Sequence, residues 1–193
     1  AHCVVLGAGV VGMGAIRVAH GIGMNVTVLN RGAERLRHID EVYRGTVTTL
    51  PLTSANTERA LAQADMVIGA LLVPGGRTPV LIRRADLKKM KPGAVIVDVS
   101  VDQGGCAETT VPRTHDDPVY TIDGVQHYTV ANMPGAYPRT STFALTNATL
   151  PWVLRLAALG ADKAVAEFTP LRKALNLQAG KVMNAAVAAA QDL

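Results

Sequence analysis

Short apolar runs alternate with segments of helical periodicity over the first two thirds of the chain. The runs are rich in Val, Ile and Leu, which is typical of strands that are covered on both faces. The pattern predicts strands at residues 3–6, 26–30, 46–50, 66–70 and 94–99, and helices at residues 10–19, 31–43 and 80–90 and from Ser54 onward. Such alternation predicts an α/β fold, a doubly wound parallel sheet with helices on both faces and right-handed crossovers.

After residue 117 the pattern changes to a hairpin followed by helices. The predicted elements are strands at residues 119–122 and 127–130 around the turn Asp123-Gly124, a helix at residues 141–159 opened by Pro138 and Thr140, a helical segment before Pro170, a turn at Ala179-Gly180 and a helix at residues 184–191. Pro151 is expected to kink or split the longest helix, and Gly160 to end it.

These elements predict two domains. Residues 1–135 form the sheet domain, and residues 136–193 form a helical C-terminal segment. This segment is too apolar to lie free in solvent, so we expect it to pack against the sheet and against a preceding part of the protein or a second subunit. The chain begins at Ala1, one residue before the first strand, and we expect an N-terminal part to be absent from it.

Composition narrows the class of protein. Of 193 residues, 49% are hydrophobic and 18% charged, which excludes a disordered chain. No apolar run approaches the roughly 20 residues that span a bilayer. The net charge of +4 comes from scattered Lys and Arg, with no cluster denser than Lys88-Lys89-Lys91. Clusters this small are typical of a solvated helix surface, so we expect neither a nucleic-acid nor a membrane partner.

The cysteines and histidines indicate no metal site. Cys3 and Cys106 are far apart without CxxC or Cys/His spacing, which favours a reducing compartment, the cytoplasm. His127 lies in a predicted strand and is expected to be a hydrogen-bonded core residue. Residues 115–117, His-Asp-Asp, are adjacent and cannot easily share one ion, so with Pro118 they predict a turn.

Three glycines follow the first strand in the order Gly-x-Gly-x-x-Gly. Gly7 can form the tight turn, Gly9 leaves the backbone open to a pyrophosphate, and Gly12 lets the helix lie close to the sheet. The helix that starts here directs its free N–H groups and the positive end of its dipole at phosphates. In this strand-turn-helix-strand context the motif predicts a Rossmann-type dinucleotide site.

The second strand ends at Asn30, where an acid normally binds the adenosine ribose. An uncharged amide followed by Arg31 repels a 2′-phosphate less than an acid does. Arg31 is either a surface charge or a 2′-phosphate contact. The predicted cofactor is therefore NAD, with NADP left open.

A second candidate region follows the strand at residues 94–99. Asp102 stands beside Gly104 and Gly105 at the carboxyl edge of a buried strand, a position that favours chemistry over packing. Cys106 is expected to be a small packed side chain, with modification of its thiol as the alternative.

Several stretches of this chain resemble bacterial alanine dehydrogenase. They are residues 4–12, 64–70, 90–98, 102–106, 114–118, 130–135 and 138–151, of which the last two are the most specific. The resemblance implies interconversion of L-alanine with pyruvate and ammonia by hydride transfer to NAD, in a homo-oligomer, a hexamer. It also implies an N-terminal substrate domain that supplies a lysine and a histidine, so we expect this stretch to be inactive alone.

The same resemblance implies roles for single residues. Gly7, Gly9, Val10, Val11 and Gly12 hold the pyrophosphate, Asn30 and Arg31 stand at the adenosine ribose, and Arg35 is near the adenosine. Leu71 and Val99 line the nicotinamide half, Asp102 lies beside the reacting carbon as the catalytic candidate, and Asn132 and Met133 lie close to nicotinamide and substrate. Asp102, when ionised, can hold a protonated amine or relay a proton through water.

Two other classes of function remain open. One is a dinucleotide-binding module without its own chemistry, such as a transhydrogenase-like nucleotide domain. The other is a structural or partner-binding domain whose cleft binds no dinucleotide.

Overall fold

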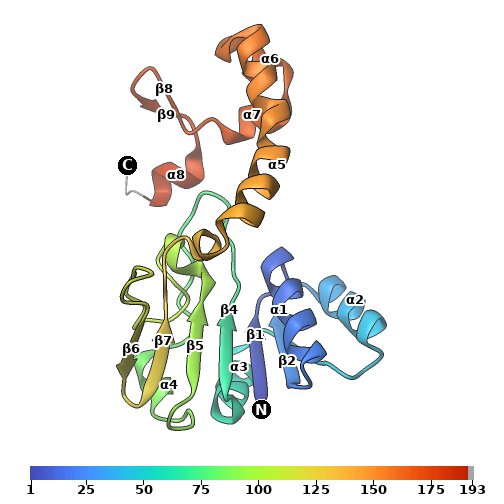
Figure 1. The fold of residues 1–193 in the computed structure, drawn as a ribbon, viewed down its shortest axis with the longest axis vertical. Coiled ribbons are helices and arrows are strands. Elements are labelled where there is room, and N and C mark those ends of the chain that lie inside the picture. The colour runs from blue at the N-terminus through green and yellow to red at the C-terminus, as the bar shows by residue number, and fades with distance from the viewer. Residues whose placement is uncertain (191–193) are drawn as a thin grey trace. The chain divides into compact units, whose positions relative to one another are not determined.

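Seven strands form one sheet in the order β3-β2-β1-β4-β5-β7-β6 in the computed structural model, which describes residues 1–190 (Figure 1). The parallel strands are β1 (His2–Leu6), β2 (Asn25–Asn30), β3 (Thr48–Pro51), β4 (Met66–Gly69), β5 (Val95–Asp98) and β7 (Val125–Tyr128). The edge strand β6 (Val119–Ile122) pairs antiparallel with β7.

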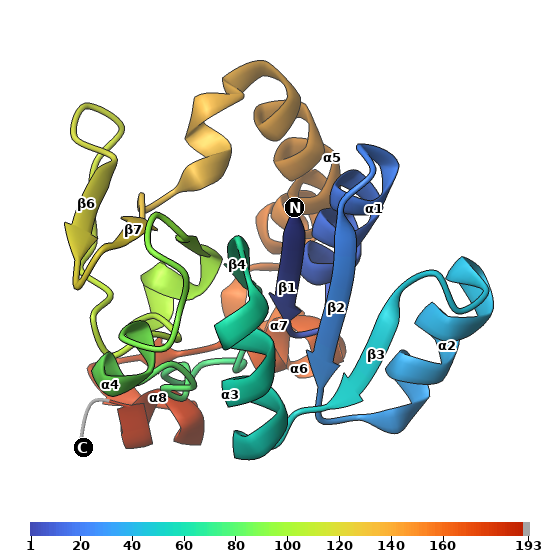
Figure 2. The same ribbon diagram turned by 90° about the horizontal axis from the view of Figure 1, so that it is seen from below.

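Helices cover both faces of this sheet. They are α1 (Val10–Gly21), α2 (Ala33–Tyr43), α3 (Ser54–Gln63) and α4 (Arg84–Leu87). Ile16 of α1 and Ile39 of α2 are buried in the same cluster as Val5, whereas Leu61 of α3 and Leu87 of α4 belong to the cluster on the other face. Figure 2 shows α3 across the sheet from α1 and α2. The prediction of a doubly wound sheet is confirmed.

The carboxyl ends of β1, β4 and β5 meet at one edge of the sheet. Leu6 is in register with Gly69, and Gly69 with Asp98. The loops that follow these strands therefore leave the sheet side by side, next to β1, where the strand order reverses. Open α/β sheets bind ligands at this kind of position.

The helix predicted over residues 80–90 is wrong, because only α4 is helical there. The backbone N–H groups of Leu81 and Ile82 both donate to the carbonyl of Cys106, and Ile82 accepts from Glu108. Ile82 forms an isolated parallel bridge with Ala107. The apolar spacing of this segment thus reflects burial of an extended chain beside the loop after β5.

Other boundaries differ by a few residues. Thr46, predicted to begin a strand, instead closes α2, because its N–H and its hydroxyl both donate to the carbonyl of Tyr43. The hydroxyl of Thr53, one residue before Ser54, caps α3 by accepting from Asn56 N–H. Strand β7 begins two residues earlier than expected, at Val125.

Backbone contacts divide the chain into two units, the second of which contains residues 74–76 and the chain from residue 132 onward. Its elements are the 3₁₀ helix η2 (Met133–Ala136), α5 (Pro138–Leu159), α6 (Ala161–Glu167), α7 (Thr169–Ala174), the hairpin β8 (Leu177–Gln178) and β9 (Lys181–Val182), and α8 (Ala185–Ala190). Pro151 does not split the longest helix, because α5 is continuous through it. The helix ends before Gly160, as predicted. The predicted end of the last helix, Gln191, lies outside the described residues.

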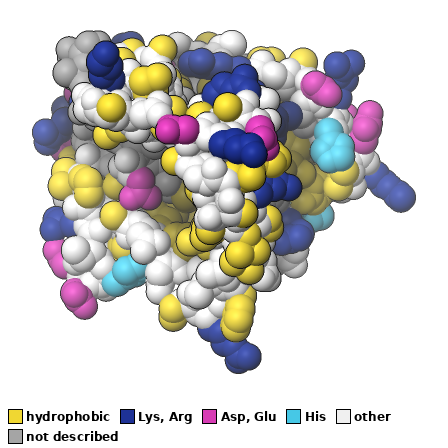
Figure 3. Space-filling view, turned by 90° about the horizontal axis from the view of Figure 1, so that it is seen from above, with side chains coloured by type: hydrophobic (Ala, Val, Ile, Leu, Met, Phe, Trp, Pro, Cys, Tyr) yellow, Lys and Arg dark blue, Asp and Glu magenta, His cyan; other side chains and the backbone are white. Residues whose placement is uncertain are grey.

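Arginine stacking joins the helices of the second unit. The Arg155 guanidinium lies over the rings of Trp152 and Phe168, at 4.5 and 4.7 Å. Elsewhere α5 exposes large apolar side chains, including Phe143 and Leu154, and hydrophobic side chains are visible at the surface among Lys and Arg in Figure 3. None of the described helices has the length and apolar character needed to cross a membrane.

Candidate functional site

The turn between β1 and α1 requires glycine at two positions for packing. Gly7 has φ +103°, and a Cβ there would lie 2.6 Å from the Ala70 carbonyl oxygen. A Cβ on Gly12 would lie 2.0 Å from the Gly7 carbonyl oxygen. Gly9 is different, because nothing lies within 4 Å of the Cβ position it lacks. Its open side therefore faces space that a ligand can occupy.

Two side chains hold this turn from the adjacent strand and helix. Asn30 Oδ1, at the end of β2, accepts a hydrogen bond from Ala8 N–H at 3.1 Å. Arg35 Nη1 of α2 donates to the Ala8 carbonyl at 2.8 Å. The peptide groups around Ala8 are thus fixed on both sides, which presents the open face of Gly9 in one orientation.

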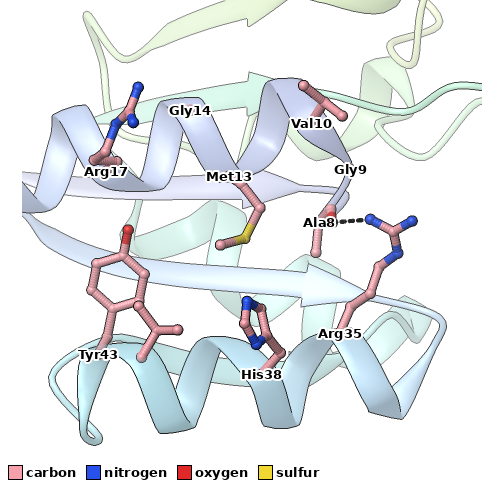
Figure 4. A pocket seen from close by; sticks show the side chains of 10 residues that line it. Ala8, Gly9, Val10, Met13, Gly14, Arg17, Arg35, His38 and Tyr43 are labelled. Atoms are coloured by element: carbon pink, nitrogen blue, oxygen red, sulfur yellow. Dashed lines mark hydrogen bonds between the residues drawn. The ribbon is translucent and has the colours of Figure 1, made fainter.

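A groove of about 660 Å³ lies between α1 and α2, beginning at the turn. Figure 4 shows Arg35 at the end nearest Ala8 and Gly9, and Arg17 and Tyr43 toward the other end. The lining residues are Ala8, Gly9, Val10, Met13, Gly14, Arg17, Arg35, His38, Val42 and Tyr43. Asp and Glu are absent from this lining, which contains the two guanidinium groups of Arg17 and Arg35.

A second cavity, of about 250 Å³, lies on the other side of the same turn. It is lined by Gly9, Val10, Val11, Ala70, Leu71, Leu72, Val99, Ser100, Asp102 and Gln103. The structure therefore brings together the turn and three further residues that the sequence singled out, Leu71, Val99 and Asp102. The Asp102 side chain is exposed, and no hydrogen bond or ion pair joins it to another described residue.

Two polar residues that the sequence analysis missed shape this cavity. Ser100 Oγ accepts from Leu71 N–H at 3.1 Å and donates to the Leu71 carbonyl at 3.0 Å. The Gln103 amide bonds both the N–H and the carbonyl of Val73, at 3.3 and 2.7 Å. Both lie in the 3₁₀ helix η1 (Val99–Gln103) and hold the chain after β4 in place as the cavity wall.

The buried carboxylate of Asp98, at the end of β5, supports the loop after this strand. The sequence analysis did not identify it as a site residue. It is fully buried and accepts hydrogen bonds from the backbone N–H groups of Ser100, Cys106 and Ala107 and from the hydroxyl of Thr110. Glycines make room for it, since a Cβ on Gly69 or Gly105 would lie within about 3 Å of its oxygens. An acid that ends an apolar strand shortly before a Gly-Gly pair is the signal that predicts such a site.

Asn132 and Met133 stand at the start of the second unit. Asn132 takes the left-handed conformation, φ 54°, and its carbonyl accepts from Gly135 N–H at 2.8 Å.

The histidine predictions agree with the structure. His127 is fully buried between the Val125 carbonyl, 3.0 Å from Nδ1, and the Thr109 hydroxyl, 2.8 Å from Nε2. Burial lowers its pKa, so the neutral ring donates through Nδ1 and accepts through Nε2. The core role is confirmed. Asp117 pairs with Arg113 at 2.6 Å within the loop that precedes Pro118, and the described residues contain no group of three potential metal ligands.

Both thiols are expected to be unreactive in the folded protein. Cys3 and Cys106 are fully buried. Burial raises the pKa of Cys3 to about 11, and burial together with the Asp98 carboxylate raises that of Cys106 well above its usual value. At about pH 8 a thiol-reactive disulfide reagent should modify neither cysteine until denaturant is added, because only the thiolate reacts. Rapid modification of the native protein would contradict the burial of both thiols.

The same shifts predict a pH dependence of stability. Since the native pKa of Cys3 exceeds the usual thiol value of 9.0, the unfolded chain releases this proton at lower pH than the folded chain. The contribution of Cys3 to stability is therefore complete below about pH 9 and declines as pH rises toward 11. Replacing Cys3 by serine should flatten this part of the unfolding free energy curve.

Comparison with known proteins agrees with the geometry. The family model described as alanine dehydrogenase/PNT, C-terminal domain, matches residues 1–185. Alanine dehydrogenase of Halomonas elongata is 51% identical over 193 residues, which are 100% of this chain and 52% of that protein. The structure of an L-alanine dehydrogenase matches with a TM-score of 0.86 at 45% identity, over 99% of this chain and 53% of the other. A transhydrogenase from Sinorhizobium meliloti matches less closely, with a TM-score of 0.66 at 27% identity over 74% of this chain and 42% of the other.

The chain thus spans about half the length of the curated relatives it matches. The family model nevertheless covers nearly all of it, including the turn, both cavities and the segment from residue 132 to residue 185. The resemblance seen in the sequence is confirmed, and the chain belongs to the alanine dehydrogenase/PNT C-terminal domain family.

Proposed function

We propose that this chain is the nucleotide-binding part of an L-alanine dehydrogenase, which oxidises L-alanine reversibly to pyruvate and ammonia with NAD. One observation carries the proposal: Gly9 and Val10 line both the groove and the smaller cavity, so the two hollows meet at the glycine turn. A dinucleotide has the matching form, two nucleoside halves joined by a pyrophosphate.

The residues at the turn fit a pyrophosphate. No side chain caps the N-terminus of α1, so its first N–H groups have no side-chain acceptor. Val10, the first residue of the helix, is 92% exposed. Open backbone at Gly9 and the positive end of the helix dipole together favour an anion here. We assign the pyrophosphate to residues 7–12 and the adenosine half to Asn30, Arg31 and Arg35.

The nicotinamide half belongs to the cavity lined by Leu71, Val99 and Asp102. When bound, NAD supplies a hydride acceptor. Leu71 and Val99 exclude water from one side, and the carboxylate of Asp102 holds the protonated amine of the substrate or takes its proton through water. By the family resemblance we assign Asn132 and Met133 to the nicotinamide and the substrate, with the Asn132 amide orienting a carboxamide or carboxylate.

The proposal extends to the rest of the protein. An N-terminal domain supplies the remaining catalytic groups, and the chain after residue 135 is a helical segment that packs in a homo-hexamer in the cytoplasm. This proposed boundary lies four residues after the division in backbone contacts, which falls between residues 131 and 132. The alternative is a transhydrogenase-like nucleotide domain, which the weaker transhydrogenase match favours. Turnover of L-alanine with NAD by the full-length protein separates the two.

Gly9→Ala tests the cofactor site. The new methyl group meets no protein atom, so thermal stability should stay unchanged. It occupies the face assigned to the pyrophosphate, so calorimetry should show at least about tenfold weaker binding of ADP-ribose, or ~1.4 kcal/mol.

Gly21→Ala is the matched control, since Gly21 ends the helix that Gly9 precedes, has equally open space at its missing Cβ, and lines neither cavity. Unchanged affinity in Gly9→Ala would remove the pyrophosphate from this turn.

A further inference from the structure

The adenosine end of the site carries positive charge and no carboxylate, and this feature bears on the kind of cofactor it binds. The inference rests on the proposed function, because it concerns the same nucleotide site. NAD-selective sites of this fold place an acid at the end of the second strand, where it accepts hydrogen bonds from the ribose hydroxyls and repels a 2′-phosphate. Asn30 occupies that position here.

Asn30 is fixed in one orientation by two hydrogen bonds. Its Oδ1 accepts from Ala8 N–H, and its Nδ2 donates to the Gly32 carbonyl at 3.0 Å. A carboxylate in the same rotamer would face that carbonyl with an oxygen and no proton, which is repulsive. The backbone between β2 and α2 therefore favours an amide over a carboxylate at position 30.

Two arginines, Arg31 and Arg35, follow Asn30 within five residues of the chain. Arg35 uses one of its N–H groups on the Ala8 carbonyl, which anchors it at the turn and leaves its other donors available. Arg31, the next residue after Asn30, is exposed, and no hydrogen bond or ion pair joins it to another described residue. Glu34, in the first turn of α2, is exposed, and neither Glu34 nor Arg31 lines the groove.

A phosphate monoester on the ribose would complete this arrangement. Guanidinium groups bind phosphate oxygens in bidentate geometry, and such charge-assisted bonds are stronger than neutral ones. We propose that Asn30, Arg31 and Arg35 form a 2′-phosphate subsite, so that this chain binds the 2′-phosphorylated cofactor, NADP(H), at least as tightly as NAD(H).

The test measures binding of two probes to the full-length protein by calorimetry, ADP-ribose and 2′-phospho-ADP-ribose. The parent protein should bind the phosphorylated probe with equal or higher affinity. Arg31→Ala should weaken binding of the phosphorylated probe about 10-fold or more, the range for one charged hydrogen bond, and leave ADP-ribose unchanged.

Arg37→Ala is the matched control, because Arg37 is an exposed arginine within α2, six residues further along the chain than Arg31. It should change neither affinity. Asn30→Asp should shift the preference toward ADP-ribose, again about 10-fold or more.

The outcomes are separable. If the parent binds ADP-ribose at least tenfold more tightly than its 2′-phosphorylated form, the subsite is refuted and the dinucleotide site stands. If Arg31→Ala and Arg37→Ala behave alike, Arg31 does not contact the phosphate and the subsite as proposed is wrong. If neither probe binds, the proposed function fails together with the inference.

Discussion

Gly12→Ala is expected to lower the unfolding free energy by about 3 kcal/mol, the upper end of the usual range for overpacking. The added Cβ would lie 2.0 Å from the Gly7 carbonyl oxygen and 3.0 Å from its carbon. These are backbone atoms of the turn, so they cannot rotate away as the end of a side chain can. At ~2–4 °C per kcal/mol, thermal unfolding should shift down by roughly 6–12 °C.

Gly14→Ala, two residues further along α1, is the control. Nothing lies within 4 Å of its missing Cβ. Alanine is favoured over glycine inside a helix by about 0.5–1 kcal/mol, so this variant should be slightly more stable than the parent. If Gly12→Ala is as stable as Gly14→Ala, then α1 does not approach the turn as closely as the structure shows.

This contrast illustrates what the sequence could predict. The spacing of Gly7, Gly9 and Gly12 after an apolar run was enough to assign a separate role to each glycine, and the geometry agrees for the packing roles of Gly7 and Gly12. The alternation of strands and helices likewise predicted the doubly wound sheet, because the pattern of burial on a sheet with two covered faces is visible in the residues themselves.

Periodicity was misleading where apolar residues are buried without regular structure. Leu81 and Ile82 bond to the loop around Cys106, about 25 residues further along the chain, and no local pattern reports such a partner. The helix predicted from Ser54 onward does begin there, and its cap is Thr53, the hydroxyl residue one position earlier.

The residues that line the two cavities were also only partly predictable from local sequence patterns. The strand-end positions of Leu71, Val99 and Asp102 were found from the sequence and the family resemblance together. The roles of Ser100 and Gln103 were not found, because their side chains form hydrogen bonds with backbone groups 29 and 30 residues away. His38 and Tyr43 were also missed, since their place in the groove depends on how α2 lies against α1.

Asp102→Asn is expected to lower kcat for L-alanine oxidation by the full-length protein about 10²–10⁴-fold, the range for a lost general acid or base. Asparagine keeps the shape of the side chain but can neither carry the negative charge nor take up a proton. Asp102 makes no hydrogen bond or ion pair with other described residues, so the fold does not depend on its charge. Thermal stability and the affinity for NAD should therefore stay close to the parent values.

Asp116→Asn provides the control, because it removes the same charge from an exposed position of the same unit that lines neither cavity. It should leave kcat unchanged. Turnover at the parent rate in Asp102→Asn would show that the carboxylate holds no proton in the reaction. A parallel loss of NAD affinity and kcat would assign Asp102 to cofactor binding instead. A fall in kcat alone is the result that the cavity predicts, since Asp102 is the only ionisable side chain among the residues that line it.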